Sequence, residues 1–376
     1  MAATDNGLLD VATFKSGSQN ARVVFILGIA ERSGTNYLQD LLRLHPDCDV
    51  DGMELEEDHF VDFSPLLVKF VQSASQGWKA WWGVEQLEKE RELVLRCIGE
   101  GLISYLRKQV LNRRLLNGMD PNKELKVLVT KSPSTQNVEL FFRVFPDAEL
   151  IILVRDGRAV VESAAKTFYR RFDKASKQWA DRANAVLQFV SKDANRDRRY
   201  LLVKYEDLYS HSDEEIRKIL RFLDLDQTQY NFTAAASLPI RGSSVLRREV
   251  AQAGDSPARG VAPGIHWNPV AKSADFNPLA RWSHWKRSQH ERFNWIAGRP
   301  LQALGYETKV YTTNRWFWTG WNWFLDVLPL ESVSWMYKRV GREFKGNPNK
   351  LHALKTLTSK AWRRLRPLIG MSNSSA

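Results

Sequence analysis

VVFILGIAERSGTNYL, residues 23–38, begins as a short apolar run and passes through a turn of small residues into a helical pattern. The run at Val23–Ile29 is rich in β-branched residues and is typical of a buried parallel strand. The turn at Ser33–Thr35 opens a helix with one apolar face, formed by Leu38, Leu41 and Leu42. The stretch therefore predicts a strand that leads into a helix N-terminus suited to binding an anion.

Similar apolar runs recur along the chain and mark further strands. They lie at Lys126–Thr130 (KVLVT), Glu149–Val154 (ELIILV) and Tyr200–Lys204 (YLLVK), and helical patterns follow the last two. Ser212 and Glu215 have the spacing of a capping box and predict the start of one of these helices. The alternation predicts an α/β fold: a doubly wound, P-loop-like three-layer sandwich with a central parallel sheet and helices on both faces.

The length of 376 residues allows one large domain with an appendage. We place the domain at residues 20–308 and expect a helical, Trp-rich and basic accessory extension at 309–376. The segment Ser243–Asn277 is rich in Gly, Pro, Ser and Ala, and it predicts a long functional loop or lid. Hydrophobic residues make up 43% of the chain and charged residues 26%, a composition that excludes a disordered or fibrous protein.

Charge and cysteine content narrow the partners and the compartment. The net charge of +12 is concentrated in Met336–Pro367, which holds ten Lys or Arg residues and one acidic residue. The remainder is nearly balanced, so we expect no nucleic-acid partner. Two cysteines cannot form a disulfide framework, and residues 1–20 lack the pattern of a signal peptide. These features predict a cytoplasmic protein.

The turn after the first strand offers several groups to a phosphate. Arg32 supplies a full positive charge and Ser33 and Thr35 supply hydroxyls, while the helix dipole adds partial charge. A Walker A loop needs Gly-Lys-Ser/Thr, but Gly34 is followed by Thr35 and Asn36. The missing lysine disfavours a kinase or NTPase. A tight turn that binds no ligand is the other interpretation of this stretch.

Two motifs in the right order resemble those of sulfotransferases that use 3'-phosphoadenosine-5'-phosphosulfate (PAPS). RSGTNYL (residues 32–38) looks like the loop that binds the 5'-phosphosulfate, and IILVRDGRAVVES (residues 151–163) looks like the 3'-phosphate motif. YEDL (205–208) and PIRGSS (239–244) extend the resemblance, although the family often has Arg-Lys-Gly where this chain has Arg-Gly-Ser. The resemblance implies PAPS as cofactor, with 3',5'-ADP (PAP) as product and no metal. It implies these donor-binding residues: Arg32, Ser33, Gly34, Thr35, Asn36, Arg155, Ser163, Tyr205, Arg241 and Gly242.

The acidic stretch MELEEDHF (residues 53–60) resembles the catalytic segment of sulfotransferases with a glutamate base. The E-x-H-F spacing of heparan sulfate 3-O-sulfotransferases selects Glu57 as general base, with Glu54 as the second choice. Repulsion among these carboxylates is expected to raise one pKa toward a useful value. His59 either orients Glu57, touches the acceptor or packs against its neighbours. A solvated acidic loop is the alternative.

Lys131, in the context Lys-Ser-Pro, takes by resemblance the role of neutralising the transferring sulfonate, together with Arg32. The cytosolic sulfotransferases have Lys-x-His-x-Pro at this point, and the histidine is missing here. The chain therefore resembles the glycan and tyrosylprotein type more than the cytosolic histidine-base type. The implied reaction transfers a sulfonate to a hydroxyl, rather than an amine, of a glycan, a lipid or a small alcohol.

The extension after residue 308 suggests a membrane surface as a further partner. Five tryptophans and several other apolar residues crowd residues 316–335, and basic residues follow as far as Arg366. This pattern predicts that residues 316–366 lie on an anionic membrane. Packing on the chain's own core and a dimer interface are the alternatives. A kinase or NTPase, and an inactive membrane- or nucleic-acid-binding protein, remain the rival functions, and the oligomeric state is open.

Overall fold

The computed structural model describes residues 21–50, 57–118, 120, 124–192, 199–241, 269–270 and 277–327. These residues belong to two compact units. The first unit comprises residues 1–286 and 296–308, and the second comprises residues 287–295 and 309–376. Glu54, Gly242, most of Ser243–Asn277 and the basic tail lie outside the described residues. The domain boundary expected at residue 308 stays a prediction.

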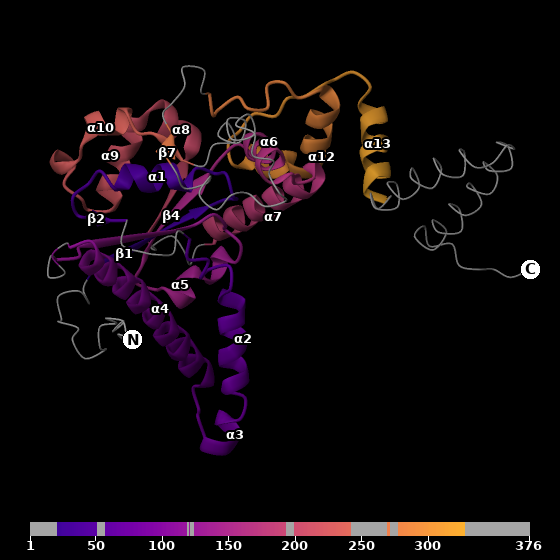
Figure 1. Cartoon of the computed structure of the whole chain (residues 1–376). Coiled ribbons are helices and arrows are strands. Elements are labelled where there is room, and N and C mark those ends of the chain that lie inside the picture. The colour runs from indigo at the N-terminus through magenta and orange to yellow at the C-terminus, as the bar shows by residue number, and fades with distance from the viewer. Residues whose placement is uncertain are drawn as a thin grey trace, which may run out of the picture. The chain divides into compact units, whose positions relative to one another are not determined.

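A five-stranded parallel sheet forms the centre of the first unit, and its strand order is β2-β3-β1-β4-β5 (Figure 1). The strands are β1 (Arg22–Gly28), β2 (Cys48–Asp49), β3 (Val127–Ser132), β4 (Glu149–Val154) and β5 (Tyr200–Lys204). Four of them are the strands that the apolar runs predict. The interiors of β1, β3 and β4 are buried because helices cover both faces of the sheet, whereas the edge strand β5 is mostly half-buried. The predicted α/β class is confirmed.

One face of the sheet is covered by helices that follow β1 and β5. They are α1 (Thr35–Leu42), α8 (Tyr205–Ser210), α9 (Ser212–Phe222), the short 3₁₀ turn η5 (Gln227–Gln229) and α10 (Phe232–Ala236). Alternate strand residues such as Val24 and Ile26 pack here against Leu38 and Leu41 of α1 and Ile219 of α9. The capping box predicted at Ser212 is wrong: His211 is the N-cap residue of α9, and no side chain caps it.

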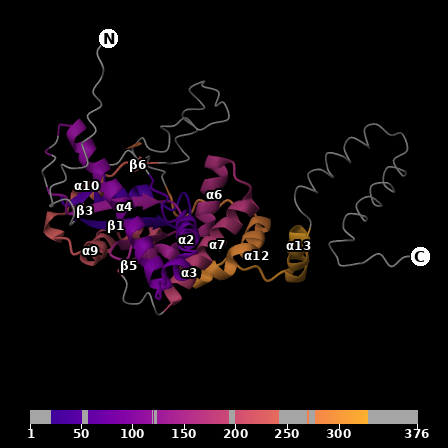
Figure 2. The same cartoon turned by 90° about the horizontal axis from the view of Figure 1, so that it is seen from below.

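The opposite face carries η3 (Val138–Leu140), α5 (Phe141–Val144), α6 (Gly157–Phe168) and α7 (Phe172–Ser191). Phe25 of β1 points to this face, where its ring centroid lies 5.3 Å from that of Phe141 and 4.7 Å from that of Phe145. Helices α6 and α7 lie side by side, as Figures 1 and 2 both show. This packing fixes the N-terminus of α6 beside the end of β4.

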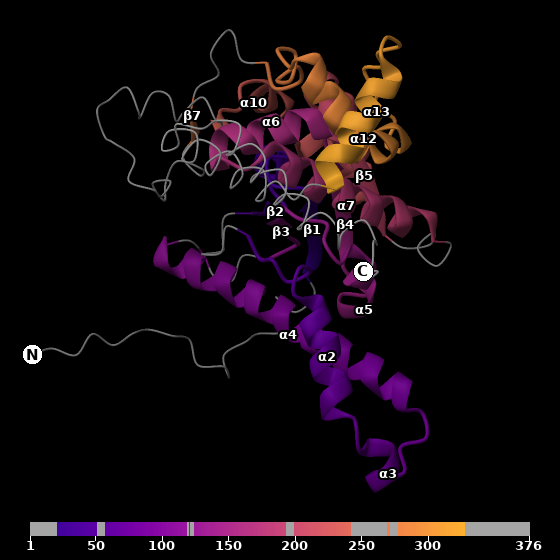
Figure 3. The ribbon, with the colours of Figure 1, turned by 90° about the vertical axis from the view of Figure 1, so that its right-hand side faces the viewer.

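An arm of three helices interrupts the chain between β2 and β3. It consists of α2 (Ser64–Ala74), α3 (Trp78–Trp82) and α4 (Leu87–Leu116), and Figure 3 shows α3 at the end that lies away from the sheet. Helix α4 packs closely on α5, since a Cβ atom at Gly99 would lie 1.9 Å from the carbonyl oxygen of Val144. Most side chains of α2 and α3 are exposed.

Two short strands and two helices complete the described chain. Strand β6 (Ile240–Arg241) pairs with β7 (Pro269–Val270) in antiparallel fashion. Helix α12 (Arg287–Ala303) contributes to both units, and α13 (Arg315–Val327) belongs to the second. Among the described residues, no helix is both long enough and apolar enough to cross a bilayer.

The register of the sheet brings the ends of its strands to one edge. Leu27 is aligned with Ser132, Gly28 with Leu153 and Val154 with Lys204. The loop after β1 and the segments that follow β3, β4 and β5 therefore lie together. In open parallel sheets this carboxyl edge is where ligands bind.

Candidate active site

The loop after β1 is a tight turn built around two glycines. Gly34 is the N-cap residue of α1, with φ of 99°, and a Cβ atom there would lie 2.4 Å from the Tyr205 ring. A Cβ atom at Gly28 would lie 2.7 Å from the Thr35 methyl group. The Ser33 hydroxyl accepts a hydrogen bond from the Ala30 N–H and donates one to the Ala30 carbonyl, so it stabilises the turn itself. The first amides of α1 are left to face an anion.

Three arginines gather beside this loop. Arg32 Nε donates to Ser163 Oγ at 3.0 Å, and Arg155 donates to the Arg32 carbonyl at 2.7 Å and lies over the Tyr205 ring. Burial, together with the charges of Arg281 and Arg155, lowers the pKa of Arg32 to about 9. Burial and the charge of Arg155 lower the pKa of Arg281 to about 10. Guanidinium groups that repel one another in this way are stabilised by a bound anion.

Arg281, the third arginine of this cluster, is not predicted by the sequence motifs. The segment that carries it is fixed to the start of α6 by three contacts. Arg155 donates to the Pro278 carbonyl at 2.7 Å, the Arg158 guanidinium stacks 3.7 Å from the Trp282 ring centroid, and the Trp285 indole donates to Glu162 at 2.7 Å. No sequence motif around Arg281 predicts these contacts, because each of them joins residues that are more than a hundred positions apart in the sequence.

Glu57 lies where β3 ends, between a lysine and a histidine. Its carboxylate is 3.8 Å from Lys131 Nζ and 3.4 Å from His59 Nε2. Burial raises the pKa of Glu57, although the charges of Lys131 and His59 oppose the shift. The Lys131 side chain is itself fully buried. The pair predicted from two separate motifs is therefore brought into contact.

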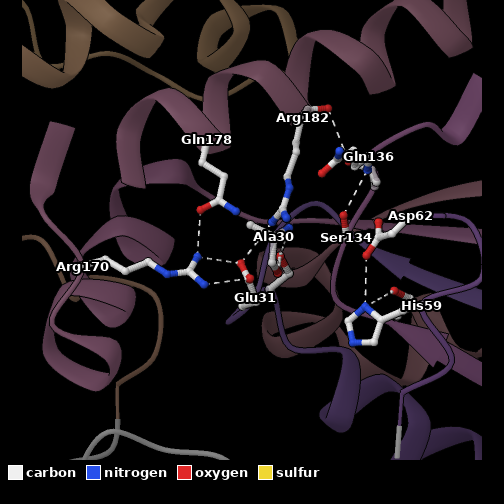
Figure 4. Close-up of polar contacts among 12 residues, drawn as sticks. Ala30, Glu31, His59, Asp62, Ser134, Gln136, Arg170, Gln178 and Arg182 are labelled. Carbon is white, nitrogen blue, oxygen red and sulfur yellow. Dashed lines mark hydrogen bonds and ion pairs between the residues drawn. The ribbon is translucent and has the colours of Figure 1, made fainter. Parts of the chain in front are cut away.

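His59 is held in place by a second carboxylate. His59 Nδ1 lies 3.0 Å from the carboxylate of Asp62 (Figure 4). Its other ring nitrogen, Nε2, lies 3.4 Å from the Glu57 carboxylate. His59 has φ of 54°, a left-handed backbone that turns its side chain toward both groups. Asp62 was missed from the sequence, although its position three residues after His59 was an available signal. This geometry favours a role for His59 in orienting Glu57.

Asp58 points away from Glu57 and fastens the acidic segment to β3. Its N–H donates to the Lys131 carbonyl at 3.1 Å, and its carboxylate accepts from Thr130 Oγ1 at 2.8 Å and from the Phe60 N–H at 2.9 Å. Burial raises the pKa of Asp58 to about 6. The burial of Asp58 disfavours the alternative of a solvated acidic loop at this residue.

Glu31 connects the loop after β1 (residues 29–34), which is called the phosphate loop below, to helix α7. Figure 4 shows its carboxylate with Arg170 and Arg182, and the three ion-pair distances lie between 2.9 and 3.0 Å. Burial would raise the pKa of Glu31, but the hydrogen bond from Arg170 and the charges of Arg182 and Arg170 lower it to about 2. The residue before Arg32 is thus a structural anchor.

These arrangements are accompanied by a match over the same residues. A model of the sulfotransferase family matches residues 23–229, which hold the sheet, Glu57, Lys131 and Arg155. The chain belongs to the sulfotransferase family. The resemblance seen in the sequence motifs is confirmed at the level of the family.

Curated relatives of this sulfotransferase include protein-tyrosine sulfotransferases. That of Drosophila melanogaster is 29% identical over 212 residues, covering 54% of this chain and 38% of the relative. Protein-tyrosine sulfotransferase A of Caenorhabditis elegans is 24% identical over 238 residues, covering 60% of this chain and 57% of the relative. The matched part of the chain spans less than two thirds of the length of either relative.

Solved structures also resemble the sulfotransferase chain. The sulfotransferase domain of the Synechococcus PCC 7002 olefin synthase has a TM-score of 0.44 and 17% identity, and the match covers 77% of this chain and 97% of that domain. Mouse sulfotransferase SULT7A1 complexed with PAP has a TM-score of 0.36 and 13% identity, covering 75% of this chain and 88% of that one.

One residue expected to bind the donor in this sulfotransferase has a different partner. The guanidinium of Arg241 is paired with the carboxylate of Asp40 on α1, and Nε lies 2.7 Å from Oδ2. The Arg241 guanidinium, which the sequence predicts to bind the 3'-phosphate, is therefore engaged in a buried ion pair with Asp40. Gly242 and Glu54 lie outside the described residues. Among the residues that the structure describes, no group of His, Cys, Asp and Glu is placed to hold a metal ion.

Proposed function

We propose that this member of the family transfers a sulfonate group from PAPS to a hydroxyl acceptor, with Glu57 as the general base. The observation that carries the proposal is the contact between Glu57 and the fully buried Lys131 at the edge of the sheet, beside the phosphate loop. A carboxylate with a raised pKa is suited to accept a proton, and a buried cation is suited to stabilise charge that develops beside it.

The residues around the phosphate loop fit a nucleotide that carries a 3'-phosphate. Arg155 Nε and Asn36 Oδ1 are buried and have no hydrogen-bond partner among the described residues. Arg32, Arg155 and Arg281 place positive charge there. Buried polar atoms without partners are costly, so a ligand with acceptor oxygens and a donor group would stabilise them. The α1 N-terminus would hold the 5'-phosphosulfate, and Arg155, Arg281 and Ser163 would hold the 3'-phosphate.

The chain's own residues would act on the acceptor in a defined way. Asp62 holds His59, and His59 and Lys131 hold the Glu57 carboxylate so that it accepts the hydroxyl proton. Lys131 and Arg32 neutralise negative charge at the transfer site. The bound donor supplies an activated sulfonate, whose bond to the 5'-phosphate breaks as the acceptor oxygen bonds to sulfur. The hydroxyl proton of the acceptor is transferred to the Glu57 carboxylate.

The acceptor is proposed as a hydroxyl, and the relatives suggest which one to test first. Those relatives are named protein-tyrosine sulfotransferases, so a tyrosine-containing peptide is the leading acceptor. A phenol has an ordinary pKa of about 10, lower than that of an aliphatic alcohol, so its proton is more readily accepted by Glu57 as the oxygen bonds to sulfur. Glycans, lipids and small alcohols are the other hydroxyl acceptors to be tested. The cytoplasmic location expected from the sequence stays a prediction.

Ligand binding and turnover test the proposal in two steps. PAP should raise the melting temperature of the full chain, with stabilisation of about 2.7 kcal/mol at a hundred times Kd. ATP with magnesium should do much less, because it lacks the 3'-phosphate. Labelled PAPS with the acceptor set should then yield a sulfated product and PAP. Equal thermal shifts with PAP and ATP would overturn the donor assignment.

A further inference from the structure

Helix α13 of the second unit exposes a row of aromatic side chains. Trp316 is 91% exposed, Phe317 61%, Trp321 44% and Phe324 45%. The rings of Phe317 and Trp321 are stacked with an interplanar angle of 8°, and Trp321 stacks in turn on Phe324. The residues 317, 321 and 324 have the spacing of one helix face. The second unit thus presents a stacked aromatic surface to its outside.

Two polar side chains of the same helix bind the first turns of α12: the buried Asn322, and Asp326, whose side chain is 36% exposed at the edge of the contact. Asn322 is only 3% exposed and donates to the Glu291 carbonyl at 3.3 Å. Asp326 accepts from Arg292 at 2.7 Å and from the Trp295 indole at 2.7 Å. A helix on a water-exposed surface normally has the opposite arrangement, with its polar face outward. These hydrogen bonds fix the rotation of α13, so the exposed aromatic face is not the result of a helix that turns on its axis.

Charge and length indicate what covers this face. The sequence after α13 carries ten Lys or Arg residues and one acidic residue between Met336 and Pro367. Such a segment is attracted to anionic lipid by about 1 kcal/mol per basic residue near the surface. Tryptophan favours the headgroup boundary. The thirteen described residues of α13 extend about 20 Å, less than a hydrocarbon core of about 30 Å, and Pro329 follows them in the sequence.

We propose that the aromatic face of α13 docks in the interface of an anionic lipid bilayer, with the helix axis in the plane of the membrane. The polar face remains bound to the first turns of α12, and the basic segment adds electrostatic attraction. This membrane attachment is independent of the proposed sulfonate transfer, because it uses no residue of the candidate active site. A second copy of the chain is the main competing occupant.

Sedimentation of the full chain with vesicles tests the proposal. The protein should bind vesicles of phosphatidylcholine with phosphatidylserine, and bind less to phosphatidylcholine alone or at high salt, where charges are screened. The double substitution Phe317→Ser/Trp321→Ser should weaken binding by at least about tenfold, since burial of even one large apolar side chain stabilises a complex by that factor or more. Trp81→Ser in α3 is the matched control, because that ring is 74% exposed in the first unit. It should bind like the wild type.

Several results would overturn the proposal. Wild-type protein that stays in solution with anionic vesicles would do so, as would a folded double variant that binds as well as the wild type. A wild-type dimer that becomes monomeric in the double variant, without vesicle binding, would assign the face to a second copy. If circular dichroism shows that the double variant is unfolded, Phe324→Ser replaces it, because Phe324 lies on the same face and is 45% exposed. Unchanged binding by that variant would also refute the idea.

Discussion

Replacing Glu31 by glutamine should destabilise the first unit far more than an ordinary surface substitution does. Glutamine keeps the shape of the side chain but removes the charge that pairs with Arg170 and Arg182. The two guanidinium groups then lose their carboxylate in a largely buried position. The phosphate loop is the segment that this loss should loosen, so PAP affinity should fall as well.

The size of the effect follows from the pKa of Glu31. Its folded value of about 2 lies below the ordinary 4.5, a difference that corresponds to roughly 3 kcal/mol. Because the folded pKa is lowered, this stabilisation is complete above about pH 4.5 and is lost as the pH falls toward 2. Urea unfolding at a series of pH values, followed by circular dichroism, should therefore show a wild-type advantage over Glu31→Gln that shrinks below pH 4.5.

Glu92→Gln is the matched control for this experiment. Glu92 also pairs with an arginine, Arg143, but both side chains are about two fifths exposed. An exposed ion pair contributes about 1 kcal/mol or less. Equal losses of stability in the Glu31→Gln and Glu92→Gln proteins at neutral pH would refute the argument. So would a wild-type advantage that stays constant between pH 5 and pH 3.

Four further substitutions test the candidate site. Glu57→Gln should keep PAP affinity but lower turnover by roughly a hundredfold or more. Because the pKa of Glu57 is raised, wild-type turnover should fall as the pH drops, with a midpoint above 4.5. A fall in turnover centred below pH 4.5 would contradict the assignment of Glu57 as the base. Arg281→Ala should weaken PAP binding by about 1.5 to 3 kcal/mol but leave the affinity for 5'-AMP nearly unchanged, as calorimetry can show. Arg241→Ala should instead lower the melting temperature with little change in PAP affinity, and the reverse pattern would restore Arg241 to the nucleotide site. Gly34→Ala should abolish PAP binding and destabilise the fold by about 1 to 3 kcal/mol, because the φ of Gly34 is positive and a Cβ atom there would collide with the Tyr205 ring. Normal PAP affinity in that variant would argue against a tight phosphate loop.

The sheet was predictable from the sequence because its strands are buried on both sides. Runs such as Val23–Leu27 and Leu150–Val154 are apolar at every position because both faces of these strands are buried, and that requirement leaves a clear local signal. The arm was not predictable in this way. Phe63, Leu66 and Phe70 of α2 are each 61% exposed, so apolar residues there do not mark a core. The capping box failed because α8 runs almost directly into α9, and Ser212 is already helical.

The candidate site was predictable only where the motifs are local. Glu57 and Lys131 come from two short motifs, and the hydrogen bond from the Asp58 N–H to the Lys131 carbonyl brings the two segments together. Arg241 looked like a phosphate ligand, but the sequence contains no sign that Asp40 would bind it. Arg281 reaches the site through contacts that depend on the folded positions of α6 and the segment after Pro278. Such long-range contacts leave no periodic pattern in the chain.

The hydrogen bond between the Asp58 N–H and the Lys131 carbonyl closes a long chain loop that contains the whole arm. Both ends of that loop are fixed to β3, so the contact between Glu57 and Lys131 is held at the base of the arm. Doubling the length of a flexible loop costs only about 0.6 kcal/mol in closure entropy. The outer end of the arm at α3 can therefore change in length or surface without disturbing the Glu57–Lys131 contact, whereas α4 is constrained by its packing on α5.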